Sequence, residues 1–444
     1  MWWGMLLVAA VLTVLCDRAS AERVKVRIFS NVAVSQINIS FDLGSYTLLG
    51  DDGVVIDTML ATGRSVAVQA SGNKMLLSVD GHNLDAYSTL QFIASDSAAI
   101  LCLNPRNASQ RTYEGNLSFR SRSGRLEMVS DVDFETYLAG VVQSEIYGGE
   151  SDIYRVQAII SRTWAMRNMK KHAADGYNFC DHVHCQAYHN RCIRPEIMLG
   201  TVASSGETIV DHDGNLIETP FHANSGGQTA NSEDVWRAAV PYLRSVVDTF
   251  SNGMKQSEWT KTMKADKWLG YFSKTHHIDI NDKALRDSLL SFQQERRRAT
   301  LLGVKLAKVR SDLGLRSAYF SVEYNEARGE VTLHGRGYGH GVGLSQEGTI
   351  RMVRLGIAYD SIIRHYYHGA MIHNANTIQD IVKMEAMTQQ ISTIIEEDKV
   401  AATQTKSKKE DWLGRLFRLR DREDREEVYD EKKQDLESDW RYAW

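Results

Sequence analysis

The sequence predicts an α+β protein in which a β-rich N-terminal part precedes a mixed core of helices and strands. Three observations lead to this class. Residues from Val24 to about Leu126 alternate apolar and polar side chains, which is the two-residue period of half-buried strands. From Asp133 the apolar residues recur at spacings of three and four, as in an amphipathic helix. Both periods then alternate to about residue 375, where a charged tail follows.

Length and composition exclude several classes of protein. The chain has 444 residues, enough for two or three compact units. Its 52 basic and 56 acidic residues give a formal charge of −4, so no basic excess favours nucleic-acid binding. The longest apolar run, Met5–Cys16, is shorter than the roughly 18 residues of a membrane-spanning helix, which excludes a multi-pass membrane protein.

The N-terminus is typical of an export signal. An apolar segment is followed by Ala19-Ser20-Ala21, an A-x-A cleavage pattern before Glu22. We therefore expect residues 1–21 to be a signal peptide and the protein to be exported to the periplasm or the cell envelope. Lipidation of Cys16 and an uncleaved anchor are the alternatives.

The expected elements follow in order. Residues 22–126 form the β-rich region, with turns at clusters of Gly, Asp and Asn. Residues 127–375 form the core. It begins with a helix carrying Phe134, Tyr137, Leu138, Val141 and Val142 on one side. After Gly148-Gly149 a second helix starts near Ser151, and Arg155 and Arg162 lie seven residues apart on one of its faces.

The rest of the core has weaker patterns. Residues 201–250 predict short strands and glycine-rich turns, and residues 254–300 predict a mixed, mainly helical segment. Residues 316–334 alternate as strands, 335–348 form a glycine-rich loop and 349–368 are helical. Residues 376–444 form a charged tail that is helical or partly disordered. The tail has an apolar helical face formed by Trp412, Leu413, Leu416 and Phe417. This face is either one side of a solvated helix or a surface that docks a partner or a membrane.

Glu145 is the first candidate for chemistry. It closes the apolar helix just before two glycines, where its carboxyl group would be partly desolvated. Desolvation raises the pKa of a carboxyl group, which suits a general acid near neutral pH. A surface glutamate that ends a helix would have the same spacing.

Cysteines and histidines are concentrated between His172 and Cys192. Thiolates and imidazoles are the ligands that zinc prefers in a closed tetrahedral site. We take Cys180, Cys185, His184 and His172 as ligands of one structural zinc, with His182 as the substitute for His172. Because the protein is expected to be exported, a disulfide among Cys180, Cys185 and Cys192 is the competing interpretation.

Two glycine-rich segments, 222–227 and 335–346, form the third block. Glycine at every second position lets the backbone approach a ligand closely. Tyr338, His340, Ser345 and Gln346 lie between these glycines and add an aromatic face and hydrogen-bonding groups that suit a sugar. The loop lacks the G-K-[ST] ending of a phosphate-binding loop.

Together these blocks resemble the stage II sporulation protein D family, also called the SpoIID/LytB or amidase-enhancer domain. The resemblance covers roughly residues 24–370. It is carried by Glu135–Glu145, Gln157-Ala158 with Arg162-Thr163, Cys180-Asp181 with His184-Cys185-Gln186, Asn224-Ser225-Gly226-Gly227, Pro241-Tyr242-Leu243, Leu313–Ser317, Gly335–Gln346 and His365–Gly369.

The resemblance implies a bacterial peptidoglycan lytic transglycosylase. Such an enzyme cleaves the β-1,4 bond from N-acetylmuramic acid to N-acetylglucosamine and leaves a 1,6-anhydro sugar, and the family favours strands without stem peptides. Glu145 falls on the family's catalytic glutamate, and the Cys/His cluster falls where some members hold a structural zinc. The candidates for lining the substrate groove are Arg155, Arg162, Ser225, Tyr338, His340 and Gln346.

Two alternatives remain at this point. A non-catalytic, glycan-binding enhancer of a cell-wall amidase would belong to the same family, within a division or sporulation complex. A zinc-dependent hydrolase is disfavoured, because two thiolates and two histidines leave no open position on the metal.

Overall fold

The computed structural model describes residues 23–375. The expected signal peptide and the charged tail with its apolar face lie outside these residues. By its contacts the chain divides into two compact units, Met1–Tyr147 with Asn168–Val202 and Gly148–Arg167 with Ala203–Trp444. Within residues 23–375, no helix has both the length and the apolar character needed to cross a membrane.

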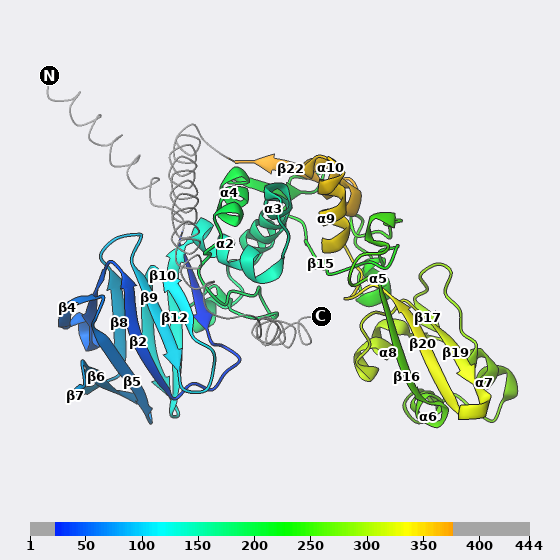
Figure 1. Ribbon diagram of the computed structural model, residues 1–444, viewed down its shortest axis with the longest axis horizontal. Helices are drawn as coiled ribbons and strands as arrows, with labels where there is room; N and C mark the ends of the chain where they lie inside the picture. Colours follow the sequence, from blue (N-terminus) through cyan, green and yellow to red (C-terminus); the bar gives the residue numbers. More distant parts are fainter. Residues whose placement is uncertain (1–22, 376–444) are drawn as a thin grey trace, which may run out of the picture. The chain divides into compact units, whose positions relative to one another are not determined.

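The first unit contains two packed β-sheets (Figure 1). One sheet has the order β13-β1-β12-β11-β8-β3-β4. Its strands are β13 (Phe179–Cys180), β1 (Arg23–Ile28), β12 (Arg125–Asp133), β11 (Asn116–Arg122), β8 (Thr89–Ala94), β3 (Ser45–Leu49) and β4 (Val55–Ala61). The other sheet comprises, in order, β10 (Arg111–Glu114), β9 (Ile100–Pro105), β2 (Gln36–Leu43), β5 (Ser65–Ser71), β6 (Lys74–Val79) and β7 (His82–Tyr87).

The strand register follows the alternation of the sequence. In β12, Leu126, Met128, Ser130 and Val132 are buried and the residues between them are not. In the two sheets of the first unit, neighbouring strands pair antiparallel except β1 and β13, which pair parallel through Val26–Phe179 and Arg27–Cys180. This last pairing attaches the start of the Cys/His segment to the edge of the sheet.

Helix α2 (Phe134–Glu145) follows β12 directly. Asp133 caps it, because its carboxylate accepts hydrogen bonds from the backbone N–H groups of Glu135 and Thr136 at 3.0 and 3.2 Å. Its apolar side is buried, and Gly140 allows close packing, since a Cβ there would lie 2.5 Å from the Tyr188 ring. The helix ends at Glu145, and Ile146 is extended.

The second unit has a core built around α3 (Ser151–Asn168). Val156, Ile159 and Ile160 pack there with residues from the C-terminal part of the described chain, including Ile363 and Tyr366. Helix α4 (Pro195–Ala203) falls in the first unit except for its last residue. The other elements of the second unit's core are β14 (Glu207–Val210) paired with β22 (Met371–Asn374), β15 (Phe221–His222) paired with β21 (Leu344–Ser345), α5 (Ser232–Val235), α9 (Gln346–Arg354) and α10 (Tyr359–Tyr366).

A three-stranded sheet and three helices form a further lobe of the second unit (Figure 1). Its elements are β16 (Glu258–Lys264), α6 (Ala265–His276), α7 (Lys283–Leu290), the hairpin β17 (Thr300–Leu301) and β18 (Val304–Lys305), α8 (Leu306–Leu313), β19 (Phe320–Asn325) and β20 (Glu330–Arg336). Trp268, Phe272 and Phe320 lie in its separate hydrophobic cluster.

The α+β class is confirmed, with strands over most of residues 23–133 and mixed elements after them. The expected β-rich region, 22–126, lies entirely in the first unit, whereas residues 127–375 contribute to both units. The segment expected to be helical at 349–368 is two helices, because Gly356 adopts a φ of +75° between them.

Candidate functional site

Glu145 is a buried carboxyl group at the C-terminal end of α2. Its side chain is 7% exposed, and its Oε1 accepts a hydrogen bond from the backbone N–H of Ala187 at 2.8 Å. Burial raises the pKa of Glu145 to about 7, and the Ala187 hydrogen bond opposes this rise. Glu145 therefore exchanges its proton close to neutral pH, as a group that both gives and takes a proton requires.

The loop that carries Ala187 is fixed to α2 by neighbouring side chains. The Tyr137 hydroxyl of α2 donates a hydrogen bond to Oε1 of Gln186 at 3.1 Å. The Tyr137 ring also stacks on Phe179 and meets Tyr188 edge-on, with ring centroids 5.6 and 5.0 Å apart. These contacts on both sides of Ala187 hold its N–H against the carboxylate of Glu145.

Asp181 attaches the same loop to the β-sheets. Its carboxylate is fully buried and accepts hydrogen bonds from the backbone N–H groups of Phe29 and Ser30 at 2.6 and 3.0 Å. It also forms an ion pair with Arg111 at 2.7 Å, in which both side chains are largely buried. A displacement of the loop would separate the two charges and leave each buried without its partner, so the pair holds the loop in this position.

The four expected metal ligands converge in the first unit. One ligand atom each from His172, Cys180, His184 and Cys185 lies within 4.8 Å of the other three. Cys185 Sγ is 3.4 Å from His172 Nε2 and 3.8 Å from His184 Nδ1, and Cys180 Sγ is 3.6 Å from His184 Nδ1. Ligand atoms at zinc-binding distance in a tetrahedron are separated by roughly 3.3–3.8 Å. The donor set therefore fits this metal in type and number, and these three distances fall in that range.

Groups around the cluster support the same arrangement. Nδ1 of His172 lies 3.4 Å from a carboxylate oxygen of Asp175, which orients the ring so that Nε2 faces Cys185. A hydrogen bond with Cys185 lowers the pKa of the Cys180 thiol below its usual range, so this sulfur is disposed to be a thiolate. His182 is not among the converging residues.

The cysteines of residues 23–375 are thiols in this structure, and the disulfide stays the competing prediction. Cys102, Cys180, Cys185 and Cys192 are all buried thiols in the described residues. Cys192 lies outside the four-residue cluster, and its thiol donates to the carbonyl of Arg194 at 3.5 Å.

Arg155 and Arg162 both reach the segment 204–207 from α3, as their shared helix face predicts. Arg155 forms two hydrogen bonds with the carboxylate of Glu207, at 2.8 and 3.2 Å, and its guanidinium lies 3.7 Å from the Tyr359 ring centroid. Arg162 is 1% exposed and donates to the carbonyls of Ser204 and Glu207. These contacts position β14, and substrate binding by either arginine stays a prediction.

Ser225 is fully buried in a polar network. Its hydroxyl donates to Asp248 at 2.7 Å and lies 2.9 Å from the Ser251 hydroxyl, which in turn is 2.9 Å from that of Ser345. The contribution of Ser225 that this geometry supports is to hold the two glycine-rich segments in place.

The two glycine-rich segments lie side by side in the second unit. Asn224 and Tyr338 exchange backbone hydrogen bonds of 3.1 and 2.8 Å, and β15 pairs with β21. Gln346 is buried with its amide 3.4 Å from that of Gln157 on α3. His340 accepts from the N–H of Val342 at 3.0 Å, and desolvation lowers the pKa of His340 to about 3, so its ring is neutral.

The structure thus gathers the predicted residues in two groups. Glu145 and the four expected metal ligands belong to the first unit, whereas the six predicted substrate-binding residues belong to the second. Sequence reasoning missed Ala187, because a backbone N–H gives no side-chain signal. It also missed Tyr137 and Asp175, which were recognisable only as an apolar helix residue and a turn residue.

Comparison with known proteins identifies the class to which this architecture belongs. Residues 122–208 match the family described as Stage II sporulation protein (SpoIID). This match includes Glu145, both α3 arginines and the four expected metal ligands. The resemblance found in the sequence is therefore confirmed for this segment, which matches the SpoIID family and is similar to proteins named for it.

Individual relatives extend the match beyond that domain. The chain is 27% identical over 270 residues to stage II sporulation protein D of Bacillus subtilis (strain 168), covering 56% of this chain and 77% of the relative. The protein of the same name from Bacillus amyloliquefaciens is 28% identical over 269 residues, covering 56% of this chain and 76% of the relative. The amidase enhancer of B. subtilis is 23% identical over 293 residues, covering 53% of this chain and 40% of that protein.

Proposed function

We propose that this protein is a lytic transglycosylase that cleaves peptide-free glycan strands of peptidoglycan between N-acetylmuramic acid and N-acetylglucosamine. The observation that carries the proposal is Glu145, a single buried carboxyl group with a pKa of about 7. Burial of the carboxyl group raises this pKa, and the hydrogen bond from the Ala187 N–H lowers it. A glycoside hydrolase ordinarily needs two carboxylates, whereas a lytic transglycosylase needs only one.

The proposed reaction uses Glu145 twice. The protonated carboxyl group donates its proton to the glycosidic oxygen as the C1–O bond breaks and positive charge develops on the muramic acid ring. The resulting carboxylate then takes the proton of the sugar's own 6-hydroxyl, whose oxygen forms the new bond to C1. The Ala187 N–H stabilises the carboxylate form between these two steps. The nucleophile belongs to the same sugar, so proximity assists the second step and no water is consumed.

The proposal includes a structural zinc held by His172, Cys180, His184 and Cys185. Four protein ligands close the coordination sphere, so the ion supplies rigidity and no open site for chemistry. Cys185 is two residues before Ala187, and the ion would therefore fix the backbone N–H that contacts Glu145.

Product analysis tests the reaction directly. The full chain incubated with peptide-free glycan strands should release fragments that end in 1,6-anhydro-muramic acid, identified by mass spectrometry as lighter by one water than hydrolytic products. Fragments with ordinary reducing ends would show that water is the nucleophile and would refute the transglycosylase.

The pH profile should fall on the alkaline side. Because burial raises the pKa of Glu145, the group is protonated below about pH 7 and loses its acid function above it. We expect kcat/KM to decline about tenfold per pH unit above the pKa, since only the protonated fraction is active. Initial rates from about pH 5 to about pH 9, with thermal melts at each pH to verify folding, measure this. A rate that rises through pH 7 would contradict the role as general acid.

A second function is favoured by one relative's name. The amidase enhancer of B. subtilis is similar to this chain, so we keep a non-catalytic role in which glycan binding stimulates a separate cell-wall amidase. Purified protein that binds peptide-free strands, releases no fragments and accelerates such an amidase would support it.

The proposed substrate places the protein outside the cytoplasm. Peptidoglycan lies in the cell envelope, which agrees with the export signal expected at residues 1–21. Secretion of a fusion that carries these residues, and its loss when they are deleted, tests this.

A further inference from the structure

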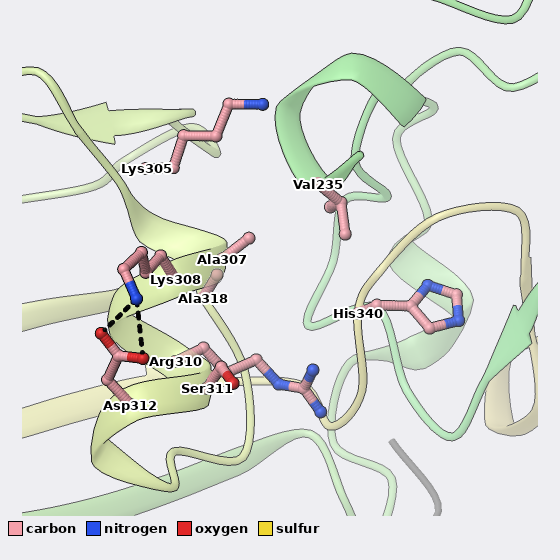
Figure 2. Close-up of a pocket in the computed structure, with 9 residues that line it drawn as sticks. All are labelled: Val235, Lys305, Ala307, Lys308, Arg310, Ser311, Asp312, Ala318 and His340. Carbon is pink, nitrogen blue, oxygen red and sulfur yellow. Dashed lines mark hydrogen bonds and ion pairs between the residues drawn. The ribbon is translucent and has the colours of Figure 1, made fainter. Parts of the chain in front are cut away.

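The second unit contains a cavity of about 310 Å³ beside α8 (Figure 2). Its volume is at the lower end of the range of small-ligand pockets, roughly 300–1,000 Å³, and suits one sugar ring or its substituent. The lining comes from α5, from α8 and its flanking residues, and from the glycine-rich loop: Val235, Lys305, Ala307, Lys308, Arg310, Ser311, Asp312, Ala318 and His340.

Positive charge dominates this lining. Arg310 extends from α8 toward the His340 ring, as Figure 2 shows, and its Nε donates to the carbonyl of Arg316 at 3.2 Å. Lys308 is paired with Asp312 at 3.0 Å, so its charge is compensated within α8.

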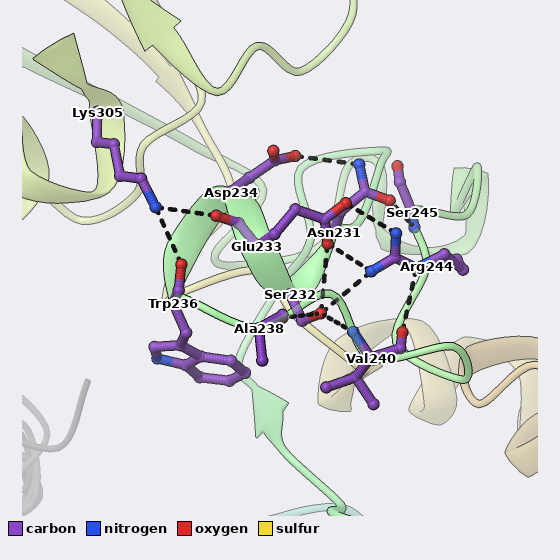
Figure 3. Close-up of polar contacts among 10 residues, drawn as sticks. All are labelled: Asn231, Ser232, Glu233, Asp234, Trp236, Ala238, Val240, Arg244, Ser245 and Lys305. Carbon is purple, nitrogen blue, oxygen red and sulfur yellow. Dashed lines mark hydrogen bonds and ion pairs between the residues drawn. The ribbon is translucent and has the colours of Figure 1, made fainter.

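Lys305 is held in place without a carboxylate partner. Its ammonium group donates to the backbone carbonyls of Glu233 and Trp236, each at 2.9 Å (Figure 3). The carboxylate of Glu233 is taken by Arg244 instead. Within residues 23–375, the Lys305 charge is therefore fixed at the cavity by carbonyl groups alone, and an ammonium group has a third N–H to offer.

A second arginine increases the positive potential near His340. Arg297 donates to the carbonyls of Gln228 and Ser225, both at 3.0 Å, and lies 5.0 Å from the Tyr319 ring centroid. Desolvation, then Arg310 and Arg297, keep the pKa of His340 low, so its ring stays neutral between them. An anion would relieve the repulsion among these groups, because desolvated like charges disfavour one another.

An aromatic ring lies beside the charged lining. The Trp236 side chain is 42% exposed, and its ring centroid is 5.3 Å from that of His340. An exposed indole next to fixed cations provides both an apolar face and charge-assisted hydrogen bonds for an acidic sugar.

We infer that this cavity binds the free lactyl carboxylate of a muramic acid residue, and that Lys305 and Arg310 thereby select strands from which the stem peptide has been removed. This inference rests on the proposed function, because it takes peptidoglycan glycan as the ligand. In intact peptidoglycan that carboxyl group is an uncharged amide that carries the peptide, and removal of the peptide restores the anion. A glycan strand is a polymer, so the cavity selects a strand without contacting the bond that is cleaved.

Binding measurements separate this inference from catalysis. The full chain with Glu145→Gln, which prevents turnover, is titrated with a peptide-free glycan fragment and with the same fragment after its lactyl carboxyl groups are converted to methylamides. We expect the free carboxylate form to bind at least about tenfold more tightly, as expected for charge-assisted contacts. Adding Lys305→Gln or Arg310→Gln should remove most of this preference while leaving the methylamide affinity unchanged.

Matched variants exclude trivial causes. Lys283→Gln on α7 removes one positive charge in the same lobe, from a side chain that is 82% exposed, and should keep the preference. Arg310→Lys should restore part of it, and unchanged melting temperatures should show that the variants fold.

The outcomes are distinct. The inference would be overturned if the chain bound the free carboxylate and methylamide fragments with equal affinity. It would also be overturned if Lys305→Gln or Arg310→Gln lowered the affinity for both fragments by the same factor. Should the wild-type chain show the preference and yet release no fragments, the proposed catalysis would fail while the carboxylate site stands.

Discussion

Replacing Glu145 with glutamine is expected to lower the rate of glycan cleavage by at least about 10³-fold, because the amide cannot give a proton to the leaving oxygen. The substitution keeps the size of the side chain, and its carbonyl oxygen can still accept the hydrogen bond from Ala187. It also removes a carboxyl group whose burial disfavours its charged form, so the fold should be retained.

The measurement compares initial rates on peptide-free strands with binding of the same strands. Glu323→Gln on β19, a glutamate whose side chain is 72% exposed, is the control and should retain full activity. A Glu145→Gln protein that stays folded and keeps activity within about tenfold of the wild type would refute the assignment, because general acid catalysis is worth more than this.

Loss of the proposed zinc should have the second-largest effect. Cys180→Ser, or removal of metal by a chelator, is expected to lower the free energy of unfolding by at least about 3 kcal/mol, because structural zinc binding contributes directly to folding. Activity should fall as well, since the loop from Cys185 to Ala187 would no longer hold the N–H that contacts Glu145.

Elemental analysis, chemical unfolding and thiol alkylation measure these effects. Metal-replete protein should contain about one zinc per chain, as a single four-ligand site requires, and both thiols should be alkylatable after chelation and denaturation. Cys192→Ala removes a buried thiol outside the cluster and should keep the metal. Finding no metal, with thiols that appear only after reduction, would convert the cluster to a disulfide and leave the Glu145 mechanism untouched.

Features that depend on residues close together in the chain could be predicted from the sequence, whereas features that depend on contacts between distant segments could not. Alternation along β12 and the three-and-four spacing along α2 are local, so both elements could be placed from the residues themselves. The convergence of His172 with Cys180, His184 and Cys185 was also predicted, because the residue types and the family resemblance agreed.

Other features depend on contacts between distant segments. Nothing near Glu145 in the chain indicates that its partner is the N–H of Ala187, 42 residues later. Arg155 and Arg162 were expected to bind substrate, which stays a prediction, and their contacts with the carboxylate and carbonyl groups of the segment 204–207 could not be anticipated from the sequence. Lys305 and Arg310 were not predicted as binding residues, because lysines and arginines are common on protein surfaces. Only the fold shows that both line one cavity.

The two units share the chain in alternation, and this has a consequence for synthesis. The first unit is interrupted by residues 148–167 and is complete only at residue 202. The apolar side of α3, with Val156 and Ile160, leaves the ribosome about 200 residues before Ile363 and Tyr366, against which it packs. A growing chain must therefore keep this helix from aggregating until its later partners have been made, and a fragment ending near residue 202 would expose it permanently. Because each unit combines separate stretches of the chain, neither can be expressed by simple truncation. Mutations that slow the folding of α9 and α10 should reduce the yield of folded protein, even though these helices belong to the other unit from Glu145.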